Sequence, residues 1–227
     1  VVLDSRNIDA ANPRGSGIGA CYAKDVEISG NIVAQQRSGT ANVCAFEISG
    51  TYQNLTIRNN VVVNWAEPGF LYAGALKFTG TALGPVVVRD NVFQQGLAGT
   101  QPGSLIYQEP AATLFRYSGN RYWTPNTGAN VMTMGVTYAQ WLTMSGETGS
   151  SFAQQTFSDP GLDVAKYMTS LGRTGGINEF LAEARKQSRA NWRPEFSAPI
   201  VNNFFRSGLG VAPQAPCVGD LNGSGTV

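Results

Sequence analysis

Four charged side chains recur at a spacing close to thirty residues, and together they could do chemistry. Arg58 and Arg89 are 31 residues apart, and Glu47 and Lys77 are 30 residues apart. Two neighbouring guanidinium groups could hold a uronate or a sulfate through paired hydrogen bonds. A lysine with a lowered pKa could remove a proton in a β-elimination. The spacing therefore raises the hypothesis of a lyase with Arg58, Lys77 and Arg89 as catalytic candidates.

Acidic and aromatic residues near these positions are candidate binding groups. Exposed aromatic rings along one face would indicate a glycan-binding module, because such rings combine a large apolar surface with a defined geometry. The candidate binding residues are Glu47, Asp90, Trp65, Tyr72 and Tyr107. The alternative interpretation is structural: Glu47 and Lys77 form an exposed ion pair, and the arginines are solvated charges that stabilise the fold little.

Composition excludes several other classes of function. The chain of 227 residues has no histidine, which removes Ser-His-Asp catalysis and histidine metal sites. Sixteen basic and fifteen acidic residues leave a net charge of +1, so no overall field favours nucleic acid. No apolar run approaches the roughly eighteen residues of a membrane span. We therefore expect neither a nucleic-acid partner nor a membrane span.

Three cysteines, Cys21, Cys44 and Cys217, are too few and too irregularly spaced for a zinc site or a disulfide framework. A bridge between Cys21 and Cys44 is one interpretation. Two buried free thiols are the other, because cysteine is among the most commonly buried residues.

An internal repeat indicates which fold would position the charged candidates. Its pattern is apolar, any, apolar, any, any, Asn, and the Asn residues are 29, 31 and 29 positions apart. The four repeats are Val26 to Asn31, Leu55 to Asn60, Val86 to Asn91 and Phe115 to Asn120. A second apolar register follows at steps of thirty through Phe46, Leu76 and Ile106. This regularity predicts an all-β solenoid over residues 1–158, a right-handed parallel β-helix of about four to five coils.

Stacked coils bring equivalent residues into columns, because parallel strands lie about 4.8 Å apart. The predicted inward column contains Ile28, Ile57, Val88 and Tyr117. The corner asparagines form a structural ladder, since an amide can bond the backbone and the next amide, and Asn tolerates left-handed turns. The same stacking makes Arg58 and Arg89 neighbours and places Glu47, Lys77 and Tyr107 in an outward column.

After Trp123 the repeat ends. The polar, glycine-rich segment from Tyr138 to Ser151 predicts a distorted last coil. Residues 159–210 then predict three short helices, with Asp159 as the first N-cap, a second helix within Gly176 to Trp192, and a third from Ser197 to Gly208. Their apolar faces predict a small cap packed on the solenoid. The aromatic residues Phe180, Trp192, Phe204 and Phe205 are expected in its core, and the alternative is a ligand cage.

Residues 211–227 read as a Pro-rich linker followed by a partial calcium loop. Oxygen-bearing side chains at alternate positions followed by glycine match the first half of an EF-hand loop. The candidate Ca²⁺ ligands are Asp220, Asn222 and Ser224. The alternative is a polar turn without a metal.

These features together resemble the pectate-lyase-like right-handed β-helix proteins that bacteria secrete. The resemblance is carried by the Asn-cornered coils, Tyr138-Ala139-Gln140-Trp141 with Ser145-Gly146-Glu147, Phe157-Ser158-Asp159-Pro160, and Gln187-Ser188-Arg189-Ala190-Asn191-Trp192-Arg193-Pro194. Cys217 to Val227 resembles the opening of a dockerin-type calcium repeat. The chain departs from the family's enzymes in lacking the histidine, paired-aspartate and Asn-Thr-Asp motifs of polygalacturonases and the Arg-x-Pro-x-x-Arg signature of pectate lyases.

The resemblance implies a secreted protein, extracellular or at the cell surface, whose partners are polysaccharides or other copies of itself joined through solenoid ends. We expect a non-catalytic structural scaffold, adhesive or self-assembling, because this interpretation explains the missing catalytic motifs. The alternative is an enzyme, a polysaccharide lyase or glycoside hydrolase that acts on acidic polysaccharide.

Overall fold

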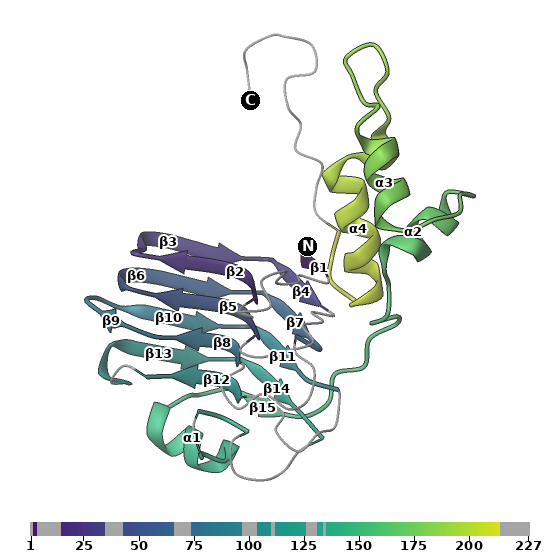
Figure 1. Cartoon of the computed structure of the whole chain (residues 1–227). Helices are drawn as coiled ribbons and strands as arrows, with labels where there is room; N and C mark the ends of the chain where they lie inside the picture. Colours follow the sequence, from purple (N-terminus) through teal and green to yellow (C-terminus); the bar gives the residue numbers. More distant parts are fainter. Residues whose placement is uncertain are drawn as a thin grey trace, which may run out of the picture. The chain divides into compact units, whose positions relative to one another are not determined.

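The computed structural model describes residues 2–3, 15–34, 43–65, 74–96, 104–109, 112–125, 131–133 and 135–213. The chain divides into two units, residues 1–155 and residues 156–227. The first unit consists mainly of parallel strands, and the second contains short helices (Figure 1). The predicted packing of a helical cap over residues 159–210 on the solenoid stays a prediction.

Three parallel sheets make up the first unit. Sheet A contains, in order, β1 (Val2–Leu3), β4 (Ile32–Ala34), β7 (Val61–Val63), β11 (Val92–Gln94), β14 (Arg121–Trp123) and β15 (Ser151–Phe152). Sheet B contains β2 (Gly15–Cys21), β5 (Val43–Ser49), β8 (Gly74–Phe78) and β12 (Ser104–Gln108). Sheet C contains β3 (Lys24–Ser29), β6 (Thr51–Arg58), β10 (Val86–Arg89) and β13 (Phe115–Ser118), with β9 (Thr81–Ala82) beside β6.

Each coil visits sheets B, C and A in turn. One coil contains β5, β6 and β7, and the next contains β8, β10 and β11, each strand parallel to its counterpart. About four such coils stack in Figure 1. The predicted parallel β-helix is therefore confirmed.

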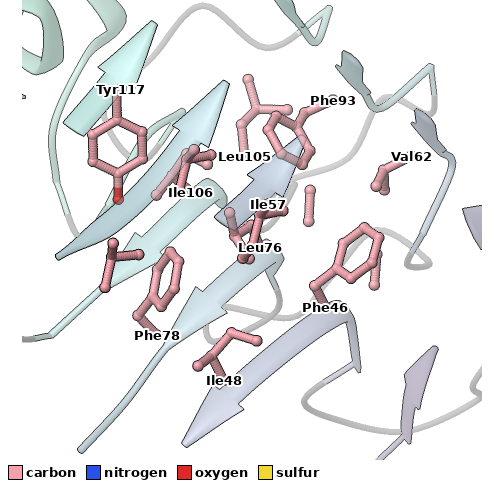
Figure 2. Close-up of a cluster of buried hydrophobic side chains, with 14 of the residues drawn as sticks. Phe46, Ile48, Ile57, Val62, Leu76, Phe78, Phe93, Leu105, Ile106 and Tyr117 are labelled. Atoms are coloured by element: carbon pink, nitrogen blue, oxygen red, sulfur yellow. The ribbon is translucent and has the colours of Figure 1, made fainter. Parts of the chain in front are cut away.

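The inward column of the repeat forms as predicted. The strand register pairs Ile28 with Ile57, Ile57 with Val88, and Val88 with Tyr117. All four side chains are buried, and Ile57 is 0% exposed. Sheet B contributes a second column of Phe46, Leu76 and Ile106, which lies in the same buried cluster (Figure 2). Stacking of like residues on like thus fills the interior one coil at a time.

A helix replaces the first half of the predicted distorted coil between Tyr138 and Ser151. Helix α1 (Tyr138–Ser145) begins with a capping box between Thr137 and Gln140 and ends at Gly146 in the left-handed conformation, φ 64°. Its buried Trp141 packs edge-on against Tyr117, with ring centroids 4.9 Å apart. Strand β15 then continues sheet A beside β14. Helix α1 therefore covers the last coil of sheet C.

The second unit contains α2 (Val164–Ser170), α3 (Ile177–Ala184), the 3-10 turn η2 (Pro194–Phe196) and α4 (Ala198–Gly208). Two details of the prediction are wrong. Asp163, not Asp159, accepts the capping hydrogen bond of α2, because the Asp159 carboxylate bonds the Gly161 amide and Lys166 instead. Helix α3 ends at Ala184, well before Trp192.

An aromatic cluster and one carboxylate hold this unit together. Ring contacts join Tyr167, Phe180, Phe196, Phe204 and Phe205. The Glu183 carboxylate contacts Lys186 at 2.5 Å, Arg193 at 2.6 Å and Arg173 at 3.0 Å. Hydrogen bonds from Lys186 and Arg193 lower the pKa of Glu183 to about 2. Trp192 is absent from the cluster and is 62% exposed, so its predicted place in the core is wrong.

The cysteine bridge does not form. Cys21 and Cys44 are both free, with Cys21 exposed and Cys44 buried. The register places Cys44 opposite Ser16, five residues from Cys21 along β2, and therefore roughly 17 Å away at about 3.3 Å per residue. That distance is far beyond the reach of a disulfide. Cys217 lies outside the described residues.

Replacing Ile57 with Ala tests the stacked core. We expect a loss of about 2–5 kcal/mol in the free energy of unfolding, because the vacated space lies between Ile28 and Val88 in the middle of a column. Urea denaturation would measure this loss. Thr56→Ala, one position away on the same strand, is the control and should change stability by about 1 kcal/mol or less. Equal losses in the two variants would contradict the column.

Candidate functional site

The repeated asparagines form a continuous hydrogen-bonded ladder at the corner between sheets C and A. The Asn60 backbone N–H donates to Asn91 Oδ1 at 3.0 Å, and Asn60 Nδ2 donates to the same oxygen at 2.9 Å. Asn91 bonds Asn120 Oδ1 in the same way, at 3.0 and 2.9 Å. The amides of Asn60, Asn91 and Asn120 also reach back to the preceding coil, as Asn91 Nδ2 does to the Ile57 carbonyl at 3.0 Å. The predicted structural ladder is therefore confirmed.

The left-handed backbone that the sequence suggests for these asparagines occurs one residue earlier. Gly30, Asn59, Asp90 and Gly119 have φ between 54° and 65°, whereas the ladder asparagines have no positive φ. A single residue in the left-handed conformation turns the chain from sheet C to sheet A, and Gly, Asn and Asp adopt this conformation most easily. The ladder position therefore requires asparagine for its amide and not for its backbone.

Glu147 ends the ladder. Its Oε1 accepts from Asn120 Nδ2 at 2.8 Å, the bond that a further asparagine would otherwise accept. Its Oε2 accepts from Trp141 Nε1 at 2.9 Å and from the Tyr122 hydroxyl at 3.0 Å. The side chain is buried, and no other charged residue in the described part of the first unit is. One carboxylate thus joins the ladder, sheet A and helix α1.

The buried carboxylate affects the ionisation of its surroundings. Burial raises the pKa of Glu147, although the hydrogen bonds from Asn120 and Trp141 act in the opposite direction. Burial, and then the nearby Glu147 charge, raise the pKa of Tyr122 well above its usual value. Three donors, Asn120, Tyr122 and Trp141, surround this one carboxylate, and the bond from Trp141 attaches helix α1.

The two arginine candidates are neighbours, as predicted, but each already has a carboxylate partner. Arg58 lies opposite Arg89 in the register of sheet C. Arg58 Nη2 contacts Glu27 Oε1 at 2.7 Å, and Arg89 Nη1 contacts Asp90 Oδ2 at 2.6 Å. The hydrogen bond from Arg58 lowers the pKa of Glu27. A uronate could bind these guanidinium groups only in competition with the protein's own carboxylates.

Lys77 lies in the predicted column of sheet B between Glu47 and Tyr107. Its Nζ is 3.9 Å from Glu47 Oε1 and 5.5 Å from the centroid of the Tyr107 ring. Glu47 also accepts a hydrogen bond from Ser16 Oγ, and the Tyr107 hydroxyl donates to Glu109. The Glu47 carboxylate and the face of the Tyr107 ring are both ordinary partners of a lysine side chain. The Lys77 side chain is only 14% exposed.

The catalytic candidates therefore lie on two different sheets. Lys77 belongs to β8 in sheet B, whereas Arg58 and Arg89 end strands β6 and β10 in sheet C. In the part of the chain that the structure describes, Lys77 makes no ion pair or hydrogen bond with either arginine. The fold therefore forms two separate groups of paired charges, one around Lys77 and one around the two arginines.

The remaining candidate binding and metal residues are either buried or outside the described residues. Trp65 and Tyr107 are buried, at 0% and 4% exposure, so neither offers an exposed ring for stacking. Tyr72 and the calcium candidates Asp220, Asn222 and Ser224 lie outside the described residues. In the described part of the chain, no group of three or more Cys, Asp or Glu residues is arranged to hold a metal. No helix there has the length and apolar character to span a membrane.

Sequence reasoning missed the role of Glu147 and misplaced Trp192. Glu147 stands 27 residues after Asn120, near the repeat spacing, and that spacing could have marked it as the last member of the ladder. Trp192 follows a Ser-x-x-Asn turn, Ser188 to Asn191, which breaks the helical spacing that suggested a core position.

Glu147→Gln tests the end of the ladder. An amide cannot accept on both of its ends, so one of the donors Asn120 and Trp141 loses its partner, at a cost of about 1–3 kcal/mol. Because burial raises the pKa of Glu147 in the folded state, Glu147 adds most to the free energy of unfolding at pH values below its pKa in the unfolded chain. This stabilisation is lost as the pH rises through the folded-state pKa. Urea unfolding should therefore show a larger difference at about pH 4 than at about pH 8.

The matched control is Asp25→Asn. Asp25 is exposed and accepts one hydrogen bond, from Asn54 Nδ2, which an amide oxygen can also accept. This variant should unfold like the wild type. If Glu147→Gln behaved like the control at both pH values, the role of Glu147 would be contradicted.

Comparison with known proteins adds no relative to this picture. No family model matches the chain, and no curated protein or solved structure matches it either. The parallel β-solenoid is shown by the structure itself, while the resemblance to pectate-lyase-like proteins and to a dockerin repeat stays a prediction from the sequence.

Proposed function

We propose that this protein is a non-catalytic extracellular β-helix scaffold whose role is adhesive. The observation that supports this proposal most is that the charged residues stacked by the repeat form ion pairs with one another. The pairs are Arg58 with Glu27, Arg89 with Asp90, and Lys77 with Glu47. The extracellular location is proposed from the sequence resemblance alone.

The polar residues of the repeat also serve the fold. Asn60, Asn91 and Asn120 are 0% exposed, and their amides are used within the ladder. Residues committed to such a network are unsuited to binding a substrate, because releasing a buried amide from its partners costs about 1–3 kcal/mol. A solenoid whose repeated amides are satisfied internally is well suited to presenting surface residues at the spacing of its coils.

Self-association through solenoid ends is a second part of the proposal. Within the described residues, β2 and β3 have a neighbouring strand on one side only. An edge strand of this kind can pair with another chain. Helix α1 covers the opposite end of sheet C, so pairing there would first require α1 to move.

A lyase would need a different arrangement. Lys77 would have to give up its Glu47 contact, and Arg58 and Arg89 would have to exchange carboxylate partners. The catalytic candidates would also have to act from two sheets. These requirements favour the scaffold over the enzyme.

An absorbance assay separates the two functions. Incubation with pectate, alginate or a glycosaminoglycan should produce no rise in ultraviolet absorbance from unsaturated uronate, because Lys77, Arg58 and Arg89 have carboxylate partners and lie on two different sheets. Arg89→Ala should change the free energy of unfolding by about 0.5–1 kcal/mol at most, as for a surface ion pair, whereas Lys77→Ala also removes the packing of a mostly buried side chain and should cost more. A rise in absorbance that disappears in Lys77→Ala would contradict the proposal and place the active site on sheet B.

A further inference from the structure

Trp192 is a large aromatic side chain held outside the core of the second unit. Its side chain is 62% exposed, while Phe196 and Phe205 nearby in sequence are buried. Leaving most of an indole in water forgoes a substantial hydrophobic stabilisation, at about 25 cal/mol per Å² of apolar surface. An isolated exposed aromatic is common on protein surfaces, so a function needs further observations.

The backbone on both sides of Trp192 is fixed. Ser188 and Asn191 exchange backbone hydrogen bonds of 3.3 and 3.1 Å, and Asn191 Nδ2 donates to the Lys186 carbonyl at 3.1 Å. After Trp192, Arg193 Nη1 contacts Glu183 at 2.6 Å, and its guanidinium lies 4.5 Å from the Phe196 ring centroid. The indole is therefore presented from a pre-organised turn, which lowers the entropy lost on binding.

The same turn is cationic. Residues 184–194 contain Arg185, Lys186, Arg189 and Arg193 and no acidic residue. Glu183 pairs with Lys186 and Arg193. Arg185 and Arg189 are exposed, and neither guanidinium has an ion pair or hydrogen bond with any residue that the structure describes. This differs from Arg58 and Arg89, whose charges are already paired.

We propose that the loop from Arg185 to Trp192 is a binding site for an acidic polysaccharide. The Trp192 ring would provide a flat apolar face for a sugar ring, and Arg185 and Arg189 would bind carboxylate or sulfate groups along the chain. The inference rests on the proposed adhesive function and gives it a ligand class. An anionic membrane fits less well, because the turn is short, carries polar Ser188 and Asn191, and is not an amphipathic helix.

The test measures retardation of the full chain in native gels containing polygalacturonate, alginate or heparin, with dextran as the neutral control. We expect retardation by at least one acidic polymer and none by dextran, with binding that weakens as salt is added. Trp192→Ala should weaken binding about tenfold, as for a central interface side chain, and Trp192→Phe should restore part of it. The double variant Arg185→Gln, Arg189→Gln should weaken binding about tenfold or more and flatten its salt dependence.

Matched controls come from the first unit. Tyr22 is 74% exposed with φ 54°, so Tyr22→Asn removes an exposed ring without straining the backbone. Arg116→Gln removes an exposed arginine charge that bonds only local carbonyls. Both variants should bind like the wild type. Thermal unfolding of Trp192→Ala should match the wild type, because an exposed ring contributes little to stability.

Several results would overturn the inference. They are the absence of retardation by all three acidic polymers, wild-type binding by Trp192→Ala, a lowered melting temperature in Trp192→Ala that reveals a packed indole, or binding to anionic lipid vesicles in place of the polymers. The absence of binding would leave the scaffold proposal standing. Binding accompanied by unsaturated products would instead contradict the non-catalytic function and leave the site intact.

Discussion

The stacking of the coils depends on one repeated interaction, the bifurcated acceptance of two N–H groups by a buried asparagine oxygen. At Asn91 this oxygen binds both the backbone and the side chain of Asn60, while its own amide binds the next oxygen and the Ile57 carbonyl. A one-residue slip of the coil that contains Ile57 would break the ladder bonds of Asn60 and turn Ile57 outward. The ladder thus fixes the register that lets like apolar residues pack on like, and it explains why the Asn spacing varies so little.

The last asparagine of the ladder needs an acceptor for its side-chain N–H that does not come from a further coil. Glu147 meets this need because an ionised carboxylate only accepts, and its second oxygen is then available to Trp141 and Tyr122. The same residue therefore terminates the polar column and docks the aromatic face of α1. Burial of its charge raises its pKa, and three hydrogen bonds limit that cost.

The sequence predicted the solenoid, its inward column and the ladder because each depends on a period that residue types reveal directly. It placed Arg58 beside Arg89 and Lys77 beside Glu47 for the same reason. It could not predict which carboxylates bind the arginines, since Glu27 and Asp90 reach them through side-chain conformations that no period encodes. Helix α1 and the turn before Trp192 lie outside the repeat, and there short-range capping and turn chemistry outweighed the apolar spacing.

The repeated polar residues of the solenoid are used within its own architecture, as the ladder asparagines are. The most direct test compares the unfolding free energies of Asn91→Ala and Asn31→Ala. Asn91→Ala removes an acceptor of two N–H groups and the donor to Ile57 and Asn120, so we predict a loss of about 3 kcal/mol or more, from several buried groups at about 1–3 kcal/mol each. Asn31→Ala removes donations to Asn60 and Ser29 at a partly exposed position and should cost about 1 kcal/mol. Equal and small losses in the two variants would contradict the claim that the ladder holds the coils in register.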